Sequence, residues 1–109
     1  MTEMTLREVC LSIGVTRRAV QGYEQAKLVS ATRRTPSGYL LYDDFAKTRI
    51  KEIKLYQDMG FSIKEIQQII DAPSEVKKPA LIHRKNMLHD DIEHFNKMIT
   101  FIEQMIDKL

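Results

Sequence analysis

The first part of the chain carries apolar side chains at the spacing of two short amphipathic helices. Between Thr5 and Gly14 they recur at intervals of three and four residues, the period of one helix face: Leu6, Val9, Cys10 and Ile13. Thr5 and Glu8 form a capping-box signal at the start of this segment, and Gly14 is a typical terminator. Thr16 has the side chain of an N-cap for a second helix. Two short helices around a glycine-containing turn predict a helix-turn-helix.

The pattern changes to that of a β-hairpin between residues 31 and 42. The Thr-Pro-Ser-Gly segment at 35–38 favours a type I turn, because proline suits its second position and glycine its fourth. From Asp43 the helical spacing returns and predicts a third helix that ends near Gly60. Its apolar face is the following set: Ala46, Ile50, Ile53 and Tyr56.

A second capping box predicts a short fourth helix. Ser62 and Glu65 start it, and it ends near Asp71. Residues 1–71 are therefore predicted to form one domain, a winged helix-turn-helix that is mainly α with a small β-hairpin wing. Residues 72–80 contain two prolines and mixed charges, which predicts a linker.

The last segment, residues 81–109, has the apolar seam of a coiled coil. Spacings of four and three residues alternate without a break, as at heptad a and d positions: Leu88, Ile92, Phe95, Ile99, Ile102, Ile106 and Leu109. From Leu88 to Leu109 the helix extends on the order of 30 Å at about 1.5 Å per residue, too far for four short helices of the same chain to cover. We therefore expect a dimerisation helix whose partner is a second copy, giving a homodimer.

The charge distribution assigns different roles to the two ends of the chain. Composition is that of one small globular protein, with 109 residues, 43% hydrophobic and 29% charged. Net charge is only +2, but residues 1–42 carry six Lys or Arg against three acids, whereas residues 81–109 carry four against five. The N-terminal part is thus expected to face a polyanion. Neither a bilayer-spanning apolar run nor a signal peptide is present, which predicts a cytoplasmic protein without membrane contact.

Arginines occur where a helix-turn-helix meets double-stranded DNA. Thr16, Arg17 and Arg18 open the second helix, which lies in the major groove in this motif. Arginine suits both bidentate guanine recognition and phosphate contact. Arg33 and Arg34 precede the hairpin turn, where a wing would lay them against the backbone or the minor groove. The alternative for the Arg17-Arg18 pair is a solvated helix face.

Four short motifs occur in a specific order and spacing: Gly14-Val15-Thr16, Tyr23-Glu24, Gly38-Tyr39 followed by Tyr42, and Gly60-Phe61-Ser62. Through them, residues 4–70 resemble the MerR family of winged-helix regulators, named for mercury resistance. The resemblance implies two helix-turn-helix units held apart by an antiparallel coiled coil. It also implies promoter DNA that is bent or untwisted, with RNA polymerase as an expected partner. The chain is expected to be a short member without an effector-binding domain.

The resemblance further implies DNA contact by Arg18, Tyr23, Arg34 and Tyr39, with Arg17 beside them. The complete predicted interface is Thr16, Arg17, Arg18, Gln21, Tyr23, Arg33, Arg34 and Tyr39. Three positions depart from the family pattern, because Gln21-Gly22 replaces an arginine and an aromatic residue, and Leu40 replaces a wing arginine. These departures predict an unusual operator preference or affinity. They also keep an alternative open, a protein-interaction module that has lost productive DNA contacts and modulates another regulator.

Signals of catalysis or metal binding are missing from the sequence. There is no nucleophile elbow, phosphate-cradling glycine loop or evident pair of catalytic carboxylates, so neither an enzyme nor a cofactor is expected. His83, His89 and His94 are six and five residues apart, which does not place two imidazoles on one helix face, so no metal site is expected. The residues identify no small-molecule effector and do not distinguish activation from repression.

Overall fold

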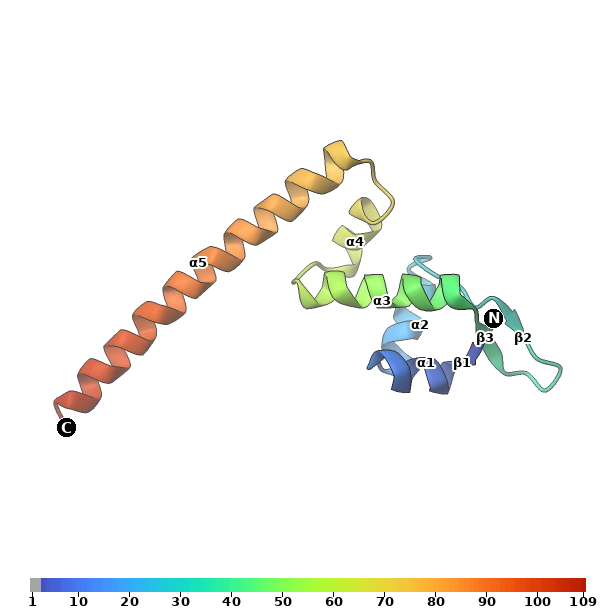
Figure 1. Cartoon of the computed structure of the whole chain (residues 1–109), viewed down its shortest axis with the longest axis horizontal. Helices are drawn as coiled ribbons and strands as arrows, with labels where there is room; N and C mark the ends of the chain where they lie inside the picture. The colour runs from blue at the N-terminus through green and yellow to red at the C-terminus, as the bar shows by residue number, and fades with distance from the viewer. Residues whose placement is uncertain (1–2) are drawn as a thin grey trace. The chain divides into compact units, whose positions relative to one another are not determined.

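The computed structural model describes residues 3–109, which form two compact units (Figure 1). The described residues up to Asp71 make up the first unit, and Ala72–Leu109 make up the second. The elements of the first unit are β1 (Met4–Thr5), α1 (Leu6–Ile13), α2 (Arg17–Gln25), β2 (Arg33–Arg34), β3 (Leu40–Tyr42), α3 (Asp44–Asp58) and α4 (Ile63–Ile69). The second unit consists of one helix, α5 (Ser74–Asp107).

The helices of the first unit begin where the local signals predict, and α1 ends at the predicted glycine. At α1, the Thr5 hydroxyl accepts a hydrogen bond from the Glu8 amide, and the Glu8 carboxylate accepts one from the Thr5 amide. Gly14 ends that helix with a φ of 80°, in the left-handed region that favours glycine. The capping box of Ser62 and Glu65 at α4 has the same reciprocal geometry. The predicted helix-turn-helix and both capping boxes are therefore confirmed.

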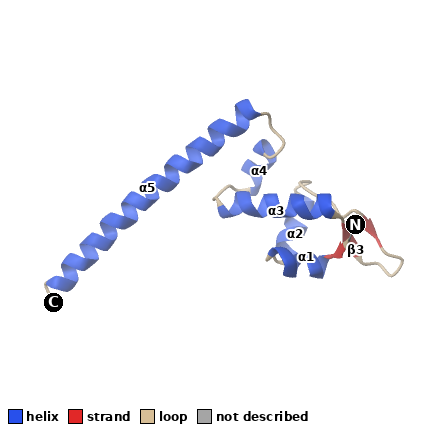
Figure 2. Cartoon of the chain, viewed as in Figure 1, coloured by secondary structure: helices blue, strands red, loops and turns tan. Residues whose placement is uncertain are grey.

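The predicted hairpin is confirmed, and it belongs to a three-stranded antiparallel sheet in the order β1-β3-β2 (Figure 2). The Gly38 amide donates to the Thr35 carbonyl at 2.9 Å, which closes the predicted turn. Gly38 has a φ of 96°, so a residue without a Cβ is needed there. The additional strand, β1, pairs Met4 with Tyr42 and so joins the start of α1 to the base of the wing.

The core of the first unit is formed by side chains of all four of its helices together with Tyr42 of β3. The largest fully buried side chains are Tyr23, Tyr42, Ile50, Ile53, Ile66, Val9 and Val20. All four residues of the predicted apolar face of α3 are buried, which confirms that face. Tyr56 and Phe61 make an edge-to-face contact with ring centroids 5.8 Å apart, and this contact packs the end of α3 against the turn into α4.

The structure corrects the predicted linker over residues 72–80. Helix α5 begins at Ser74 and contains Pro79, so only residues 70–73 connect it to α4. Pro79 is the sixth residue of the helix, and its ring nitrogen cannot donate to the carbonyl of Glu75. Glu75 is exposed, so water can satisfy that carbonyl, while the neighbouring Glu, Lys and Ala residues favour helix. The prolines therefore mark the start of the long helix rather than a gap before it.

Candidate nucleic-acid interface

The exposed face of α2 carries the predicted recognition residues. Thr16 caps the helix, its Oγ1 accepting a hydrogen bond from the Ala19 amide at 3.0 Å. Arg17, Arg18 and Gln21 are exposed. Neither arginine forms an ion pair with any residue in the described range 3–109. Two positive side chains thus stand at a helix N-terminus, where unpaired amides and the helix dipole also favour an anion.

A groove of about 460 Å³ joins the first turn of α2 to the wing. We call it the arginine groove, and its lining is Thr5, Leu6, Arg7, Arg17, Arg34, Gly38, Tyr39 and Leu40. Three of these side chains are guanidinium groups and none is a carboxylate. Arg7 is a residue that the sequence analysis did not single out. It lies in α1, and the pairing of β1 with β3 brings it beside the wing, so sequence spacing alone holds no signal for it.

Of the predicted wing residues, Arg34 and Tyr39 line the arginine groove, whereas Arg33 forms an ion pair outside it. The Arg34 Nη1 atom donates to the Gly38 carbonyl at 2.8 Å, which braces the turn, and Tyr39 is 65% exposed. Arg33 instead forms an ion pair with Glu3, with 2.7 Å between Nη2 and Oε1, and this bond raises the pKa of the guanidinium. Of the predicted wing residues, Arg34 and Tyr39 therefore lie together at the groove, whereas the charge of Arg33 is already balanced.

The structure corrects the placement of Tyr23. Its side chain is only 2% exposed, and its hydroxyl donates to Oε1 of Gln57 at 2.6 Å. Burial raises the pKa of this phenol, so it stays protonated and able to donate. Tyr23 thus packs α2 against α3 and does not lie on the exposed face with Arg17 and Arg18.

We expect Tyr23→Phe to lower stability without changing the charge contacts of the protein to DNA. The substitution removes one hydrogen bond from a largely buried hydroxyl, which costs about 1 kcal/mol of unfolding free energy. Urea unfolding measures this cost, and a DNA titration over a salt series measures the contacts. A lower affinity of the folded variant at fixed salt would restore Tyr23 to the DNA interface, because losing a neutral hydroxyl contact changes the affinity and not the salt slope.

Gly22 lies inside α2, and a Cβ added there meets no atom within 4 Å. Its backbone φ is not in the left-handed region, so no conformational need for glycine exists at this position. We expect Gly22→Ala to raise the unfolding free energy by about 1 kcal/mol, the difference in helix propensity between the two residues. Thermal or urea unfolding checks this prediction, and a destabilised variant would contradict it.

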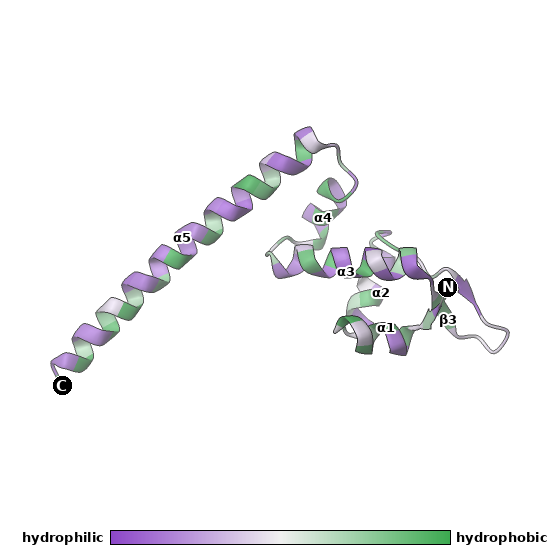
Figure 3. Cartoon of the chain, in the orientation of Figure 1, coloured by the Kyte–Doolittle hydropathy of each residue, from purple (hydrophilic) through white to green (hydrophobic). Residues whose placement is uncertain are grey.

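The α5 helix exposes the predicted seam along its length. All seven seam residues, named in the sequence analysis, are exposed, and α5 contains no buried residue at all. The apolar bands recur along the helix in Figure 3. Met98, Phe101 and Met105 form a second exposed row beside the seam. Within the described part of the chain, no helix combines the length and apolar character needed to cross a membrane.

With α1 and α2 as a helix-turn-helix and the β2–β3 hairpin as a wing, the first unit has the architecture of a winged helix-turn-helix. A family model described as "MerR HTH family regulatory protein" matches residues 4–73, and a second, described as "MerR, DNA binding", matches residues 48–109. The chain belongs to the MerR family, which confirms the resemblance and the fold class. Membership in a family of regulatory proteins also agrees with the expectation that the protein is not an enzyme.

Known proteins resemble the chain over nearly its whole length. It is 28% identical over 101 residues to the HTH-type transcriptional activator mta of Bacillus subtilis, covering 93% of this chain and 39% of that protein. A MerR family regulator from Bacillus cereus matches with a TM-score of 0.82 and 25% identity, over 98% of this chain and 82% of the other. HiNmlR, a MerR family regulator lacking the sensor domain and solved bound to promoter DNA, has the same fold, with a TM-score of 0.72 and 15% identity over 96% and 88% of the two chains. The chain thus spans about two fifths of the length of the curated relative.

Proposed function

We propose that this protein is a transcription regulator that binds promoter DNA as a homodimer. The observation that carries the proposal is the arginine groove, in which three guanidinium groups and no carboxylate line one surface beside the recognition helix. Such a surface is complementary to a phosphate backbone. The relatives support it, since one is named as a transcriptional activator and another was solved on promoter DNA.

In this proposal, α2 enters the major groove through its N-terminal end. Arg17, Arg18 and Gln21 would reach base edges and phosphates there, with Thr16 holding the helix start. Arg34 and Tyr39 of the wing would contact the adjacent backbone. Arg7 is added to the interface because it shares the arginine groove with Arg17 and Arg34.

The homodimer follows from the exposed seam of α5. The exposed apolar stripe from Leu88 to Leu109 is about 30 Å long at about 1.5 Å per residue, and a stripe of this length needs a partner of similar length. A second copy of α5, running antiparallel as the family resemblance implies, would cover it and relate two recognition helices by a two-fold axis. The DNA site would then be an inverted repeat with a fixed half-site spacing.

We further propose that the dimer acts by deforming the promoter. The resemblance implies bending or untwisting of the DNA between polymerase-recognition elements, so RNA polymerase is the expected partner on the promoter. Deforming DNA over one site costs several kcal/mol, on the order of 1 to 6, and phosphate contacts by Arg7, Arg17 and Arg34 would offset this cost.

Selection from random duplex DNA tests the proposal directly. The purified protein is incubated with pooled duplexes at several salt concentrations, and the bound fraction is sequenced. We expect enrichment of an inverted repeat with one half-site spacing, together with a steep decrease of affinity with salt, because phosphate contacts release counterions. Weak binding without enrichment would contradict the proposal.

Three residues favour the second candidate, a protein-interaction module that modulates another regulator. Gln21 is exposed and Gly22 is half-buried on α2, and Leu40 gives the arginine groove an apolar wall where the family pattern has an arginine. Gln21 and Leu40 stand where the family pattern has arginines, so fewer phosphate contacts are expected at these two positions. If the selection enriches no sequence, this candidate takes first place.

A further inference from the structure

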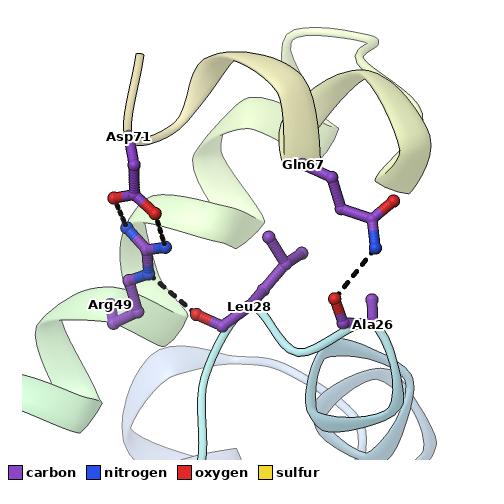
Figure 4. A network of polar contacts seen from close by, with 5 residues as sticks. All are labelled: Ala26, Leu28, Arg49, Gln67 and Asp71. Carbon is purple, nitrogen blue, oxygen red and sulfur yellow. Dashed lines mark hydrogen bonds and ion pairs between the residues drawn. The ribbon is translucent and has the colours of Figure 1, made fainter.

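Arg49 makes three hydrogen bonds that join distant parts of the first unit (Figure 4). Its Nε atom donates to the Leu28 carbonyl at 2.8 Å, and its Nη1 and Nη2 atoms donate to the Asp71 carboxylate at 2.8 and 2.7 Å. The side chain is 17% exposed and projects from the first half of α3. One planar guanidinium thus holds two segments that lie more than twenty residues away from it on either side.

The first of these segments is the C-terminal end of the recognition helix. After α2, Lys27 adopts a φ of 61°, and the Leu28 amide donates back to the Tyr23 carbonyl at 3.0 Å, which is the pattern of a Schellman motif. Gln67 of α4 donates to the Ala26 carbonyl at 2.8 Å from the other side (Figure 4). Side chains of α3 and α4 therefore fix the position in which α2 ends.

The second segment is the end of the first unit. Asp71 is its last residue, and α5 begins three residues later at Ser74. The Asp71 side chain is 75% exposed, so its ion pair with Arg49 adds little to the free energy of unfolding. The bidentate arrangement nevertheless restricts the direction of the carboxylate and of the backbone that carries it. The hydrogen bond to Asp71 raises the pKa of Arg49, which keeps the guanidinium charged.

We propose that Arg49 is a positioning residue for DNA recognition, because it links the end of α2 to the residue from which the chain continues into α5. The inference rests on the proposed function, in which α5 pairs two copies. The clamp holds the end of the recognition helix and Asp71, the last residue of the first unit, against α3, so the chain leaves for α5 from a point that is fixed relative to the recognition helix. Freeing that point would widen the range of separations that the two recognition helices of a dimer can take. Arg49 therefore determines how strictly the dimer selects its half-site spacing, without itself contacting DNA.

The test compares binding to the selected inverted repeat with binding to the same repeat whose half-sites are moved one base pair closer or further apart. We expect Arg49→Gln to reduce the affinity ratio between correct and altered spacing by about fivefold or more, a typical coupling between sites. Asp71→Asn, which keeps the bond to Leu28, should reduce it less. Arg49→Lys keeps the charge but not the bidentate bond, so it should reduce the spacing ratio as Arg49→Gln does. It replaces Arg49→Gln in the test if the Gln variant does not fold.

The matched control is Ile53→Val, which weakens the core of the same unit without touching the clamp. All variants are measured at a temperature at which they are folded, with the salt slope as a second readout. We expect unchanged salt slopes throughout and an unchanged spacing ratio for Ile53→Val. The inference about Arg49 is overturned if the spacing ratio is unchanged in the Arg49 variants, or if Ile53→Val reduces that ratio as much as they do. Either result leaves the proposed function standing. A wild-type chain that selects no inverted repeat overturns both the inference and the proposed function.

Discussion

Replacing Arg17 and Arg18 together by alanine is expected to lower the affinity for the selected DNA site by about 100-fold, since each arginine contact contributes roughly 1–3 kcal/mol. Both side chains are exposed at the N-terminal end of α2, and neither is engaged in an ion pair within residues 3–109. Their loss therefore releases no partner inside the protein. The same change should reduce the slope of log affinity against log salt by up to about two, at about 0.9 for each lost phosphate contact.

A titration of the variant over the same salt series measures both quantities. The matched control replaces Lys85 and Lys97 of α5 by alanine, which removes the same net charge from the second unit. This control should change the slope far less, because its residues lie outside the proposed interface. An equal loss of affinity and of salt slope in the two variants would indicate that DNA binding depends only on the net charge of the protein. Unchanged binding in the arginine variant would contradict the assignment of α2 as the recognition helix.

The second large effect is expected from Ile99→Asp, near the middle of the α5 seam. Ile99 is 52% exposed in the single chain and would be buried in the proposed dimer. An aspartate there must lose its hydration without gaining a partner, at a cost of about 3 kcal/mol or more for each copy. We expect the protein to be monomeric at low micromolar concentration, with affinity for the inverted repeat falling alongside.

Sedimentation velocity of the variant and the wild type measures the change. Thr100→Asp adds the same charge one residue later, where the position leaves the seam, so this control should stay dimeric. Circular dichroism provides a further readout, because an unpaired amphipathic helix loses much of its helicity in water. A dimer that persists in Ile99→Asp would contradict the seam assignment.

The two substitutions separate two contributions to DNA binding. The arginine variant should keep the dimer and lose contacts, so its salt slope falls. The Ile99 variant should keep the contacts of each unit and lose their linkage, so its affinity for a single half-site should change little. Both results together would distinguish the regulator from the interaction module, which requires the dimer helix or the wing but not Arg17 and Arg18.

Much of the first unit could be predicted because its signals are local. Capping boxes join residues three positions apart, and the 35–38 turn closes between residues of the same short segment. The apolar spacing of α3 likewise indicated its buried face. The linker prediction was wrong because proline was weighed as a breaker, although Pro73 precedes the helix as its N-cap and Pro79 removes only the hydrogen bond to the carbonyl of the exposed Glu75.

The sequence by itself determined where the helices of the first unit begin, the wing and the apolar seam, since these depend on contacts within a few residues. Tertiary structure decided which side chains share a surface. Strand pairing brings Arg7 beside Arg17 and Arg34, packing buries Tyr23 against Gln57, and Glu3 engages Arg33. The same holds for Arg49, whose partners are more than twenty residues distant in both directions. Such contacts form only when separate elements pack together, and the spacing of apolar residues along one helix or strand does not indicate which other elements lie beside it.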